Sequence, residues 1–422
     1  MANSYLSRTS GTATNTDICT LSVWIKRSKL SGNDEIIIGE YTDASNRAKL
    51  LFNADQLHFF QRTGGSTTAD VKTTRVFRDS SAWYHIVIAF DTTQSTNTDR
   101  IKFYINGVQE TAFANTSYPS SGQNIRINES SITQLIGYAG TTNTYFDGYM
   151  SHVAFVDGQA LAPTTFGETD STSGIWKFKT PTGVTFGNNG FHLKFENSGA
   201  MGTDSSGNSN TFTVNGNLKQ SLDTPSNVHA VMNPLAFQGA SNIALTNGNL
   251  TATNSASTHR SVFSTFAVSK GKWYFETKIG SVGGNYPTIG IYNADGHLTA
   301  ADYFTVNANG YGYNSNGSIY HNNSAAVSGQ ATWTTGDIIG VALDVDNDKV
   351  YFSKNGSYIN SANPSSGSNG QSITADSTWY FAAHSNDGGT DPVQNYNFGD
   401  GFFGTTAITS AGSNGNGSLF EY

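Results

Sequence analysis

The chain has little cysteine, proline or charge. Among its 422 residues there are one Cys and 8 Pro, and 13% of the residues are charged. Because one cysteine cannot form a disulfide within the chain, we expect hydrophobic cores to hold the fold together. No apolar run approaches the about 18 residues that a membrane-spanning helix needs, so we expect no membrane insertion.

The cysteine itself, Cys19, lies in a strand-like run and alternates with Leu21 and Val23, which places all three on one face. Free cysteine commonly behaves as a small apolar residue in a core. We therefore predict that Cys19 is buried and is not a nucleophile.

Positive charge is also scarce. The chain has 23 Lys and Arg against 31 Asp and Glu, which gives a net charge of -8. A nucleic-acid partner requires a basic face, so this balance argues against one. The basic cluster at residues 26–29 is interpreted as a solvated strand edge.

Residues 1–20 contain neither a basic region nor an apolar segment of the kind found in secretory signals, so no signal peptide is expected. The composition is nevertheless typical of a protein that works outside a cell, since it is rich in Asn, Ser, Thr and Gly and poor in Lys. A virion component made in the host cytoplasm and released by lysis fits both observations. The alternative is a secreted protein whose leader is missing from this sequence.

Aromatic residues and glycine are abundant. The chain has 26 Phe, 20 Tyr, 6 Trp and 45 Gly. The rings supply large buried surfaces, and glycine supplies turns. No ten-residue window has a helical apolar period, so we predict an all-β fold.

Two distant stretches share one hairpin design and predict two antiparallel β-sandwiches. In each, a β-branched run and an alternating run are followed by Asn-Gly, a dipeptide that readily takes the positive φ angles of a tight turn. The first consists of residues 84–90 and 101–105 with Asn106-Gly107, and the second of residues 338–343 and 350–352 with Asn355-Gly356.

Residues 4–162 carry the motifs LSVWIKR, WYHIVIAFDTT, DRIKFYINGV, LIGYAG and YFDGYMSHVAFVDGQAL. This ordered set resembles the laminin-G-like branch of the concanavalin A-type jelly rolls. The resemblance implies a two-sheet jelly roll that binds glycans or proteins, in some members through Ca²⁺. Residues 191–195 are similar to a motif that opens such domains, and we expect them to form a late edge strand or a separate small unit.

The second half carries GKWYFETKI, TIGIY, GYGYNSNG, GDIIGVALDVDNDKVYFSKNG, WYFAA and YNFG. This set resembles a SPRY (B30.2-like) sandwich, which implies a binding module without catalysis. The order of the two modules, followed by NFG, resembles structural proteins of marine tailed phages, whose chains often continue further.

We therefore predict a jelly roll over residues 1–215, an ordered connector over 216–236 that Pro225 and Pro234 stiffen, and a SPRY-like sandwich over 237–404. Residues 405–422 form a C-terminal extension that ends in a strand-like segment. An unpaired edge strand can pair with a neighbouring subunit, so we expect a homo-oligomer, with a trimer as one candidate.

Because jelly rolls of this type include glycanases, paired carboxylates are relevant. Glu35 and Glu40, with Asp34 beside them, are the acids that come nearest to such a carboxylate pair in the sequence. Their odd spacing predicts that the two glutamates lie on opposite faces of a strand as solvent-facing acids. We assign no catalytic residue and expect no enzyme.

No metal-binding residue is assigned, because the nine His residues lack zinc spacing. His85 and His152 are interpreted as sheet residues with satisfied nitrogens. Asp344, Asp346 and Asp348 imitate the start of a calcium loop, but Lys349 replaces the required glycine, so a hairpin turn is predicted. A Ca²⁺ ion held by loop carboxylates is left open for Asp147, Asp157 and Asp204.

Aromatic rings beside Asn amides suit sugars, which need a face for stacking and fixed partners for hydroxyls. The segment 311–323 has this composition, and other loops could reach the same rim. The competing interpretation is that its tyrosines pack between strands. The candidate ligand-binding residues are Tyr286, His297, Tyr311, Tyr313, Tyr320, His321 and His384.

The sequence thus predicts a non-enzymatic virion protein, a head decoration, head fibre or tail fibre, which binds other virion proteins and a host-surface glycan. The alternatives are a secreted bacterial lectin or adhesin and, from another class, a glycan hydrolase. Fold alone does not decide among these roles.

Overall fold

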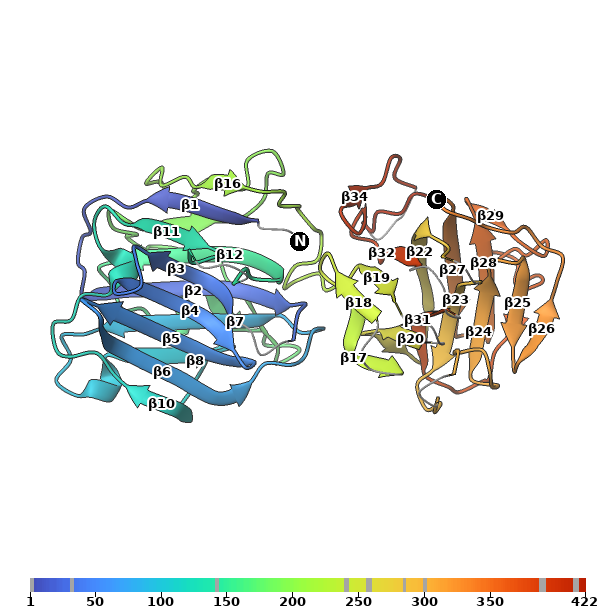
Figure 1. The fold of residues 1–422 in the computed structure, drawn as a ribbon, viewed down its shortest axis with the longest axis horizontal. Coiled ribbons are helices and arrows are strands. Elements are labelled where there is room, and N and C mark those ends of the chain that lie inside the picture. Colours follow the sequence, from blue (N-terminus) through green and yellow to red (C-terminus); the bar gives the residue numbers. More distant parts are fainter. Residues whose placement is uncertain are drawn as a thin grey trace. The chain divides into compact units, whose positions relative to one another are not determined.

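The computed structural model describes residues 4–422 except 31–33, 141–143, 239–242, 256–259, 284–285, 299–301, 387–391 and 413–416. The described residues form strands and three short 3-10 turns but no α-helix, which confirms the all-β prediction (Figure 1). Among them there is no helix long and apolar enough to cross a membrane. The chain divides into unit 1, Met1–Gln220 with Thr224–Val228, and unit 2, Ser221–Asp223 with His229–Tyr422.

Unit 1 is a sandwich of two antiparallel sheets. The eight-stranded sheet has the order β10-β6-β5-β4-β3-β11-β1-β16, and the six-stranded sheet has the order β15-β12-β2-β7-β8-β9. The strands of the first are β1 (Tyr5–Thr9), β3 (Glu35–Tyr41), β4 (Arg47–Asn53), β5 (Gln56–Thr63), β6 (Ser66–Val76), β10 (Phe113–Ser117), β11 (Thr133–Ile136) and β16 (Thr213–Asn215). Those of the second are β2 (Ile18–Arg27), β7 (Tyr84–Asp91), β8 (Ile101–Ile105), β9 (Val108–Gln109), β12 (Gly148–Asp157) and β15 (Phe191–Leu193).

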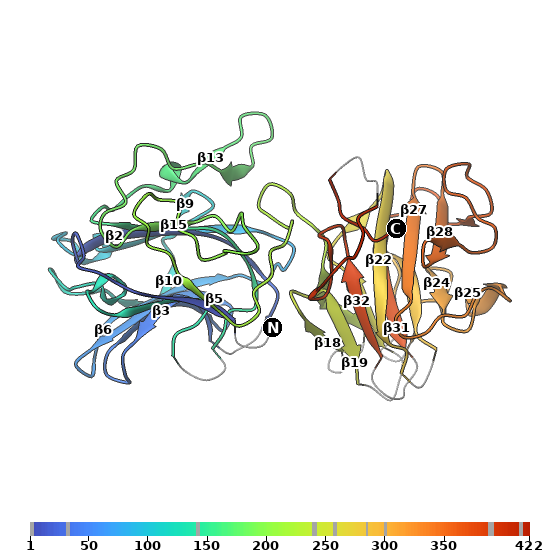
Figure 2. The same cartoon turned by 90° about the horizontal axis from the view of Figure 1, so that it is seen from above.

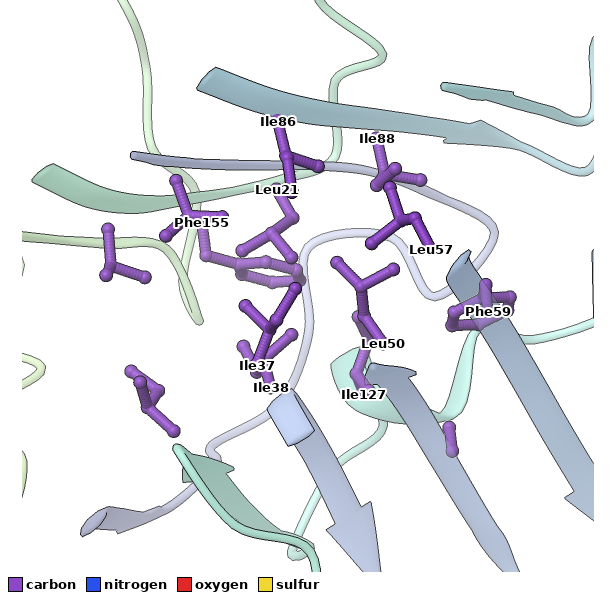
Figure 3. Packing of buried hydrophobic residues seen from close by; sticks show 14 of the residues in the cluster. Leu21, Ile37, Ile38, Leu50, Leu57, Phe59, Ile86, Ile88, Ile127 and Phe155 are labelled. Atoms are coloured by element: carbon purple, nitrogen blue, oxygen red, sulfur yellow. The ribbon is translucent and has the colours of Figure 1, made fainter. Parts of the chain in front are cut away.

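Every second side chain along these strands points inward, and these apolar side chains fill the space between the two sheets. Cys19, Leu21 and Val23 all have 0% exposure, which confirms the predicted burial of the cysteine. Leu21 from the six-stranded sheet points toward Ile37 and Ile38 of the other sheet (Figure 3). Burial of this apolar surface is the main favourable term for folding.

β15 pairs with β12 at the edge of the six-stranded sheet, so residues 191–193 form the predicted late edge strand. Residues 163–190, here called the strap, precede it and carry the short ribbon of β13 (Gly167–Thr169) and β14 (Trp176–Phe178). The strap covers the outer face of the six-stranded sheet, as the position of β13 beyond β2 and β15 shows (Figure 2).

Unit 2 consists of two further antiparallel sheets and a short ribbon, β33 (Phe402–Phe403) with β34 (Thr406–Ala407). One sheet contains β17 (Met232–Gln238), β20 (Arg260–Ser264), β21 (Ala267–Val268), β23 (Thr288–Asn293), β24 (Gly310–Asn314), β25 (Ser318–His321), β26 (Ser324–Val327) and β31 (Trp379–Asn386). The other contains β18 (Ile243–Thr246), β19 (Thr251–Asn254), β22 (Lys272–Ser281), β27 (Ile338–Asp344), β28 (Lys349–Lys354), β29 (Ser357–Tyr358), β30 (Gln371–Ser372) and β32 (Val393–Asn397).

Both predicted Asn-Gly turns are present. Asn106 and Gly107 have φ angles of 48° and 80°, and Asn355 and Gly356 have φ angles of 48° and 79°. Each pair joins the last strand but one of its sheet to a two-residue edge strand, β8 to β9 and β28 to β29. Asp344 pairs with Lys349 across the turn between β27 and β28, so the acidic segment is a hairpin turn.

The basic cluster at residues 26–29 differs from the prediction. Lys26 and Arg27 have 0% exposure, so this segment is not a solvated strand edge. The guanidinium of Arg27 donates to Glu35, Asp55 and the carbonyl of Phe77 and lies 4.4 Å from the ring centroid of Phe52. The charge is buried because its hydrogen bonds and ion pairs compensate for lost hydration.

The segment predicted as a connector, residues 216–236, is divided between the two units. Residues 216–220 and 224–228 belong to unit 1, and residues from His229 onward belong to unit 2. β17 starts at Met232 and pairs with β20, so the end of the predicted connector is part of a sheet.

The last residues bind to their own unit. The backbone N–H groups of Glu421 and Tyr422 donate to the buried carboxylate of Glu276 at 2.8 Å each. Phe420 packs edge-on against Tyr274 and is 6% exposed. These two N–H groups and the Phe420 ring therefore have partners within unit 2, and pairing of this segment with another subunit stays a prediction.

Candidate functional site

The outer face of the eight-stranded sheet carries an unusual set of side chains. Along β4, β5 and β6 the residues that alternate with the core positions point away from the core. We call this set the polar face, and its members are Arg47, Lys49, Asn53, His58, Phe60, Asp70 and Lys72.

Strand register places these residues side by side. Phe60 lies between Lys49 on β4 and Asp70 on β6, and His58 is the neighbour of Lys72. Phe60 and His58 are half-buried, and their rings meet edge-on with centroids 6.0 Å apart. A half-buried aromatic ring on a sheet face offers a flat apolar surface to a ligand.

Hydrogen bonds hold the polar groups around that ring in place. His58 Nε2 lies 2.8 Å from Asp70 Oδ1, which also accepts a hydrogen bond from Asn115 Nδ2. Lys72 Nζ donates to Asn53 Oδ1 at 2.6 Å. Burial lowers the pKa of His58, and the carboxylate of Asp70 opposes this shift. Such fixed donors and acceptors can recognise hydroxyl groups.

Two cations on β4 have no such partners. Within the described part of the chain, the side chains of Arg47 and Lys49 form neither a hydrogen bond nor an ion pair. The Arg47 guanidinium lies 5.7 Å from the ring centroid of Phe60. Lys49 is 8% exposed, and burial lowers the pKa of its ammonium.

The loop that follows β11 borders the polar face. Ala139 packs with Ile36 and Leu51 on the outer side of the sheet. A side chain at Gly39, the neighbour of Lys49 on β3, would come within 2.9 Å of the Ala139 Cβ atom. The loop therefore covers the sheet up to Lys49, and Tyr138 and Tyr145 of the same loop stack with ring centroids 4.4 Å apart.

The structure places the candidate ligand-binding residues of unit 2 in different environments. Tyr311 and Tyr313 are 7% and 0% exposed, because they are the cross-strand neighbours of the buried residues Ile291 and Ile289 on β23. His321 stacks on Tyr311 with centroids 3.9 Å apart. The competing interpretation, packing between strands, therefore describes these tyrosines, and they are not surface residues for a sugar.

Tyr286 and Tyr320 are placed differently. Tyr286 is 63% exposed, and its carbonyl accepts a hydrogen bond from Asn314 Nδ2. Asn316 binds the Asn314 side chain through its backbone N–H and donates to the half-buried Tyr320 through Nδ2. These two tyrosines share one end of the β24–β25 hairpin.

The remaining two candidates belong to other segments of unit 2. His297 is exposed in the loop after β23. His384 belongs to β31, where its backbone pairs with Ile289 and Val262, and its side chain lies outside the described atoms.

The polar face was not predicted from sequence. The available signal was the alternation in Gln56–Thr63, where Leu57 and Phe59 take the core positions and leave His58 and Phe60 on the other face. Which of the two faces of a sheet stays accessible depends on the loop that packs on it, and this loop was not foreseen.

The carboxylates considered for catalysis are internal. Glu35 and Glu40 both face the core side, because a bulge between Ile36 and Ile38 shifts the register of β3 by one residue. Glu35 binds Arg27 at 2.8 Å, and Glu40 binds Arg126. Both acids are buried, so the prediction of opposite, solvent-facing positions is wrong.

The carboxylates considered for calcium are occupied by donors. Asp157 accepts hydrogen bonds from the backbone N–H groups of Thr14, Asn15 and Asn189 and from Asn128 Nδ2. Asp204 accepts from the N–H groups of His192, Ser206 and Asn210. Half-buried Asp147 keeps its Oδ1 atom without a hydrogen-bond partner, and desolvation raises its pKa. In the described residues no group of three or more His, Cys, Asp or Glu is placed to hold a metal ion.

Comparison with protein families agrees with the two sandwiches. Residues 1–165 match the family described as the concanavalin A-like lectin/glucanases superfamily, and residues 272–365 match the SPRY domain. The chain is therefore an all-β protein with a concanavalin A-like jelly roll followed by a SPRY sandwich, which are domains of a binding type. No curated protein sequence matches the chain.

Several solved structures are similar to parts of the chain. The SPRY domain of human HERC1 is 16% identical, with a TM-score of 0.31, and the match covers 39% of this chain and 96% of that one. The TRIM65 PSpry domain is 10% identical over 39% and 90%, with a TM-score of 0.30. Domain 4 of AbnA, a GH43 extracellular arabinanase from Geobacillus stearothermophilus solved with arabinotriose, is 17% identical over 36% and 65%, with a TM-score of 0.27.

Proposed function

We propose that this protein is a non-catalytic glycan-binding protein and that the polar face of unit 1 is its sugar site. The observation that carries the proposal is the half-buried ring of Phe60 among fixed polar groups on the outer face of a jelly-roll sheet. The ring supplies a surface for sugar C–H groups, and His58, Asp70 and Lys72 supply polar partners for hydroxyls.

We also propose that the polar face binds a glycan without cleaving it. Hydrolysis of a glycosidic bond ordinarily needs two carboxyl groups on either side of the bond. On the polar face, Asp70 is engaged by His58 and Asn115, and the next carboxylate, Asp34, accepts a hydrogen bond from Asn53. Both acids therefore serve as fixed acceptors in the proposed site.

A glycan array followed by titration with the best ligand tests the proposal. We expect binding without release of reducing ends. Phe60→Ala should weaken binding about tenfold or more, since stacking on an aromatic ring contributes on the order of 1–2 kcal/mol. Phe60→Leu keeps apolar bulk and controls for local packing, so it should lose the stacking contribution while retaining the melting temperature.

Tyr286→Ala is the matched control in unit 2, because Tyr286 is an exposed ring of the predicted rim. If Tyr286→Ala abolishes binding and Phe60→Ala does not, the site is the β24–β25 rim and the proposal for unit 1 is wrong. Release of reducing ends from a bound glycan would support the hydrolase alternative.

We further propose that the protein acts on the outside of a tailed-phage particle, where it binds other virion proteins as a homo-oligomer. The resemblance of the module order and the neutral, Asn- and Ser-rich composition support this setting. Mass spectrometry of purified particles should find the chain at a fixed copy number, and mass photometry should find an oligomer. Detection in culture supernatant without particles would instead support a secreted lectin.

A further inference from the structure

We propose that the ligand of the polar face is an acidic glycan, whose carboxylate or sulfate group is bound by Lys49 and Arg47 while a sugar ring lies on Phe60. This inference rests on the proposed function and specifies its ligand class. It starts from the two cations on β4 that lack partners.

A cation without a partner at a buried or half-buried position lowers the stability of the folded protein. Lys49 is 8% exposed, and a buried ammonium loses hydration that an anion or hydrogen-bond acceptor ordinarily replaces. Elsewhere in unit 1 buried cations follow that rule: Arg27 binds Glu35 and Asp55, and Arg126 binds Glu40. In the described part of the chain Lys49 and Arg47 are exceptions, so an anion from outside would supply the missing partner.

The surroundings keep this charge uncompensated. The carboxylate of Asp34 raises the pKa of Lys49 against the effect of burial, and its Oδ1 atom already accepts a hydrogen bond from Asn53. Asp70 binds His58 and Asn115 and forms no ion pair with Arg47 or Lys49, and Lys72, itself a cation, binds Asn53. The cations Arg47, Lys49 and Lys72 outnumber the carboxylates Asp34 and Asp70 here, although the whole chain has a net charge of -8.

The cations Lys49 and Arg47 lie beside the Phe60 ring on which the sugar is proposed to stack. Lys49 is the direct cross-strand neighbour of Phe60, and such neighbours have Cβ atoms about 5 Å apart. Arg47 reaches the same ring and leaves its Nε atom without a partner. The separation of an acidic substituent from its sugar ring is of the same order, so one residue of an acidic polysaccharide can contact both groups. A planar guanidinium with free donors also suits a carboxylate or sulfate.

Paired probes test the ligand class. Polygalacturonate and its methyl ester differ in the carboxylate, and dextran sulfate and dextran differ in the sulfate. Binding is measured by calorimetry with the full chain at two salt concentrations. We expect the anionic member of at least one pair to bind about tenfold more tightly than its neutral partner, and the pair that shows this difference identifies the acidic group.

The variants locate the effect. Lys49→Met and Arg47→Met should each reduce binding of the acidic glycan about tenfold, and Lys49→Arg should keep most of it. Lys219→Met is the matched control, since it removes one exposed positive charge from the same unit. Circular dichroism confirms that each variant is folded.

The outcomes separate the two proposals. Equal binding of acidic and neutral probes, reduced by Phe60→Ala, would overturn the acidic class and leave glycan binding standing. Equal losses in Lys49→Met and Lys219→Met would show non-specific attraction and would also overturn it. No binding of any glycan would contradict the proposed function itself.

Discussion

Lys49 connects stability and binding at the scale of one residue. Burial lowers the pKa of its ammonium, Arg47 acts in the same direction, and Asp34 opposes them. A side chain that destabilises the free protein and recognises a ligand is typical of a binding site, where function limits stability.

We therefore expect Lys49→Met to stabilise unit 1 while it weakens ligand binding. Methionine keeps the length of the side chain and removes the charge. A gain of about 1 kcal/mol would raise the melting temperature of a unit of this size by about 2–4 °C. Calorimetry of wild type, Lys49→Met and Lys219→Met measures the effect, and a lower melting temperature for Lys49→Met would show that the ammonium has a stabilising partner.

Gly107 shows how a turn residue and the strap depend on each other at the scale of elements. Its φ angle is 80°, and an added Cβ atom would lie 2.6 Å from the Trp176 ring. Gly174 has a φ angle of 71°, and an added Cβ atom there meets nothing within 4 Å. The two glycines differ in packing and share the backbone conformation.

Gly107→Ala should therefore destabilise unit 1 more than Gly174→Ala. The shared backbone cost is about 1 kcal/mol, and displacement of Trp176 adds about 1–3 kcal/mol at Gly107. Urea unfolding of the two variants, followed by tryptophan fluorescence, measures the difference. Equal losses would mean that the strap adapts without cost.

Buried histidines should make the strap sensitive to acid. His85 accepts a hydrogen bond from Trp176 Nε1, and His152 stacks on Phe178. Burial lowers the pKa of His85 to about 3 and those of His152 and His192 to about 4. Nearby charges act on His152 and His192. Lys194 lowers the pKa of both, and Asp204 and Glu196 raise the pKa of His192.

Unfolded histidines titrate near 6.5. Between this value and the folded values the unfolded state binds protons that the folded state does not, so the free energy of unfolding decreases as the pH falls from about 6.5 to about 4. Each histidine contributes at most about 1.4 kcal/mol per pH unit. Hydrogen exchange of residues 163–190 at pH 7 and pH 4.5, corrected for the slower intrinsic exchange in acid, should show lower protection factors at pH 4.5. Protection that does not change would contradict the prediction, and His192→Asn should reduce the pH dependence.

The sequence predicted strands and turns well and predicted side-chain environments less well, for a physical reason. Alternation and Asn-Gly turns are local, so Cys19 and the two hairpins were placed correctly. Glu35 and Glu40 were misplaced because one extra residue in a bulge reverses alternation, and short-range patterns do not reveal it.

At the scale of the whole molecule, the partners of a charge are contributed by distant segments. Arg27 on β2 binds Asp55 beyond β4, and the bond from Arg126 to Glu40 spans 86 residues. The polar face likewise depends on Ala139, which packs on Ile36 and Leu51 and covers the outer side of the sheet up to Lys49. Such long-range pairing decides which acidic and basic side chains are available to a ligand.

The two units should fold independently, and unit 1 should carry the glycan site by itself. The core cluster of unit 1 and the side chains packed on it lie between Leu6 and Leu218, and the polar face lies within Arg47–Lys72. A fragment of residues 1–220 should therefore unfold cooperatively and bind the acidic glycan as the full chain does, whereas residues 221–422 should fold and fail to bind. Circular dichroism, thermal unfolding and calorimetry on both fragments test this. If residues 1–220 fold but do not bind while residues 221–422 do, the sugar site belongs to the SPRY sandwich and the polar face must have another role.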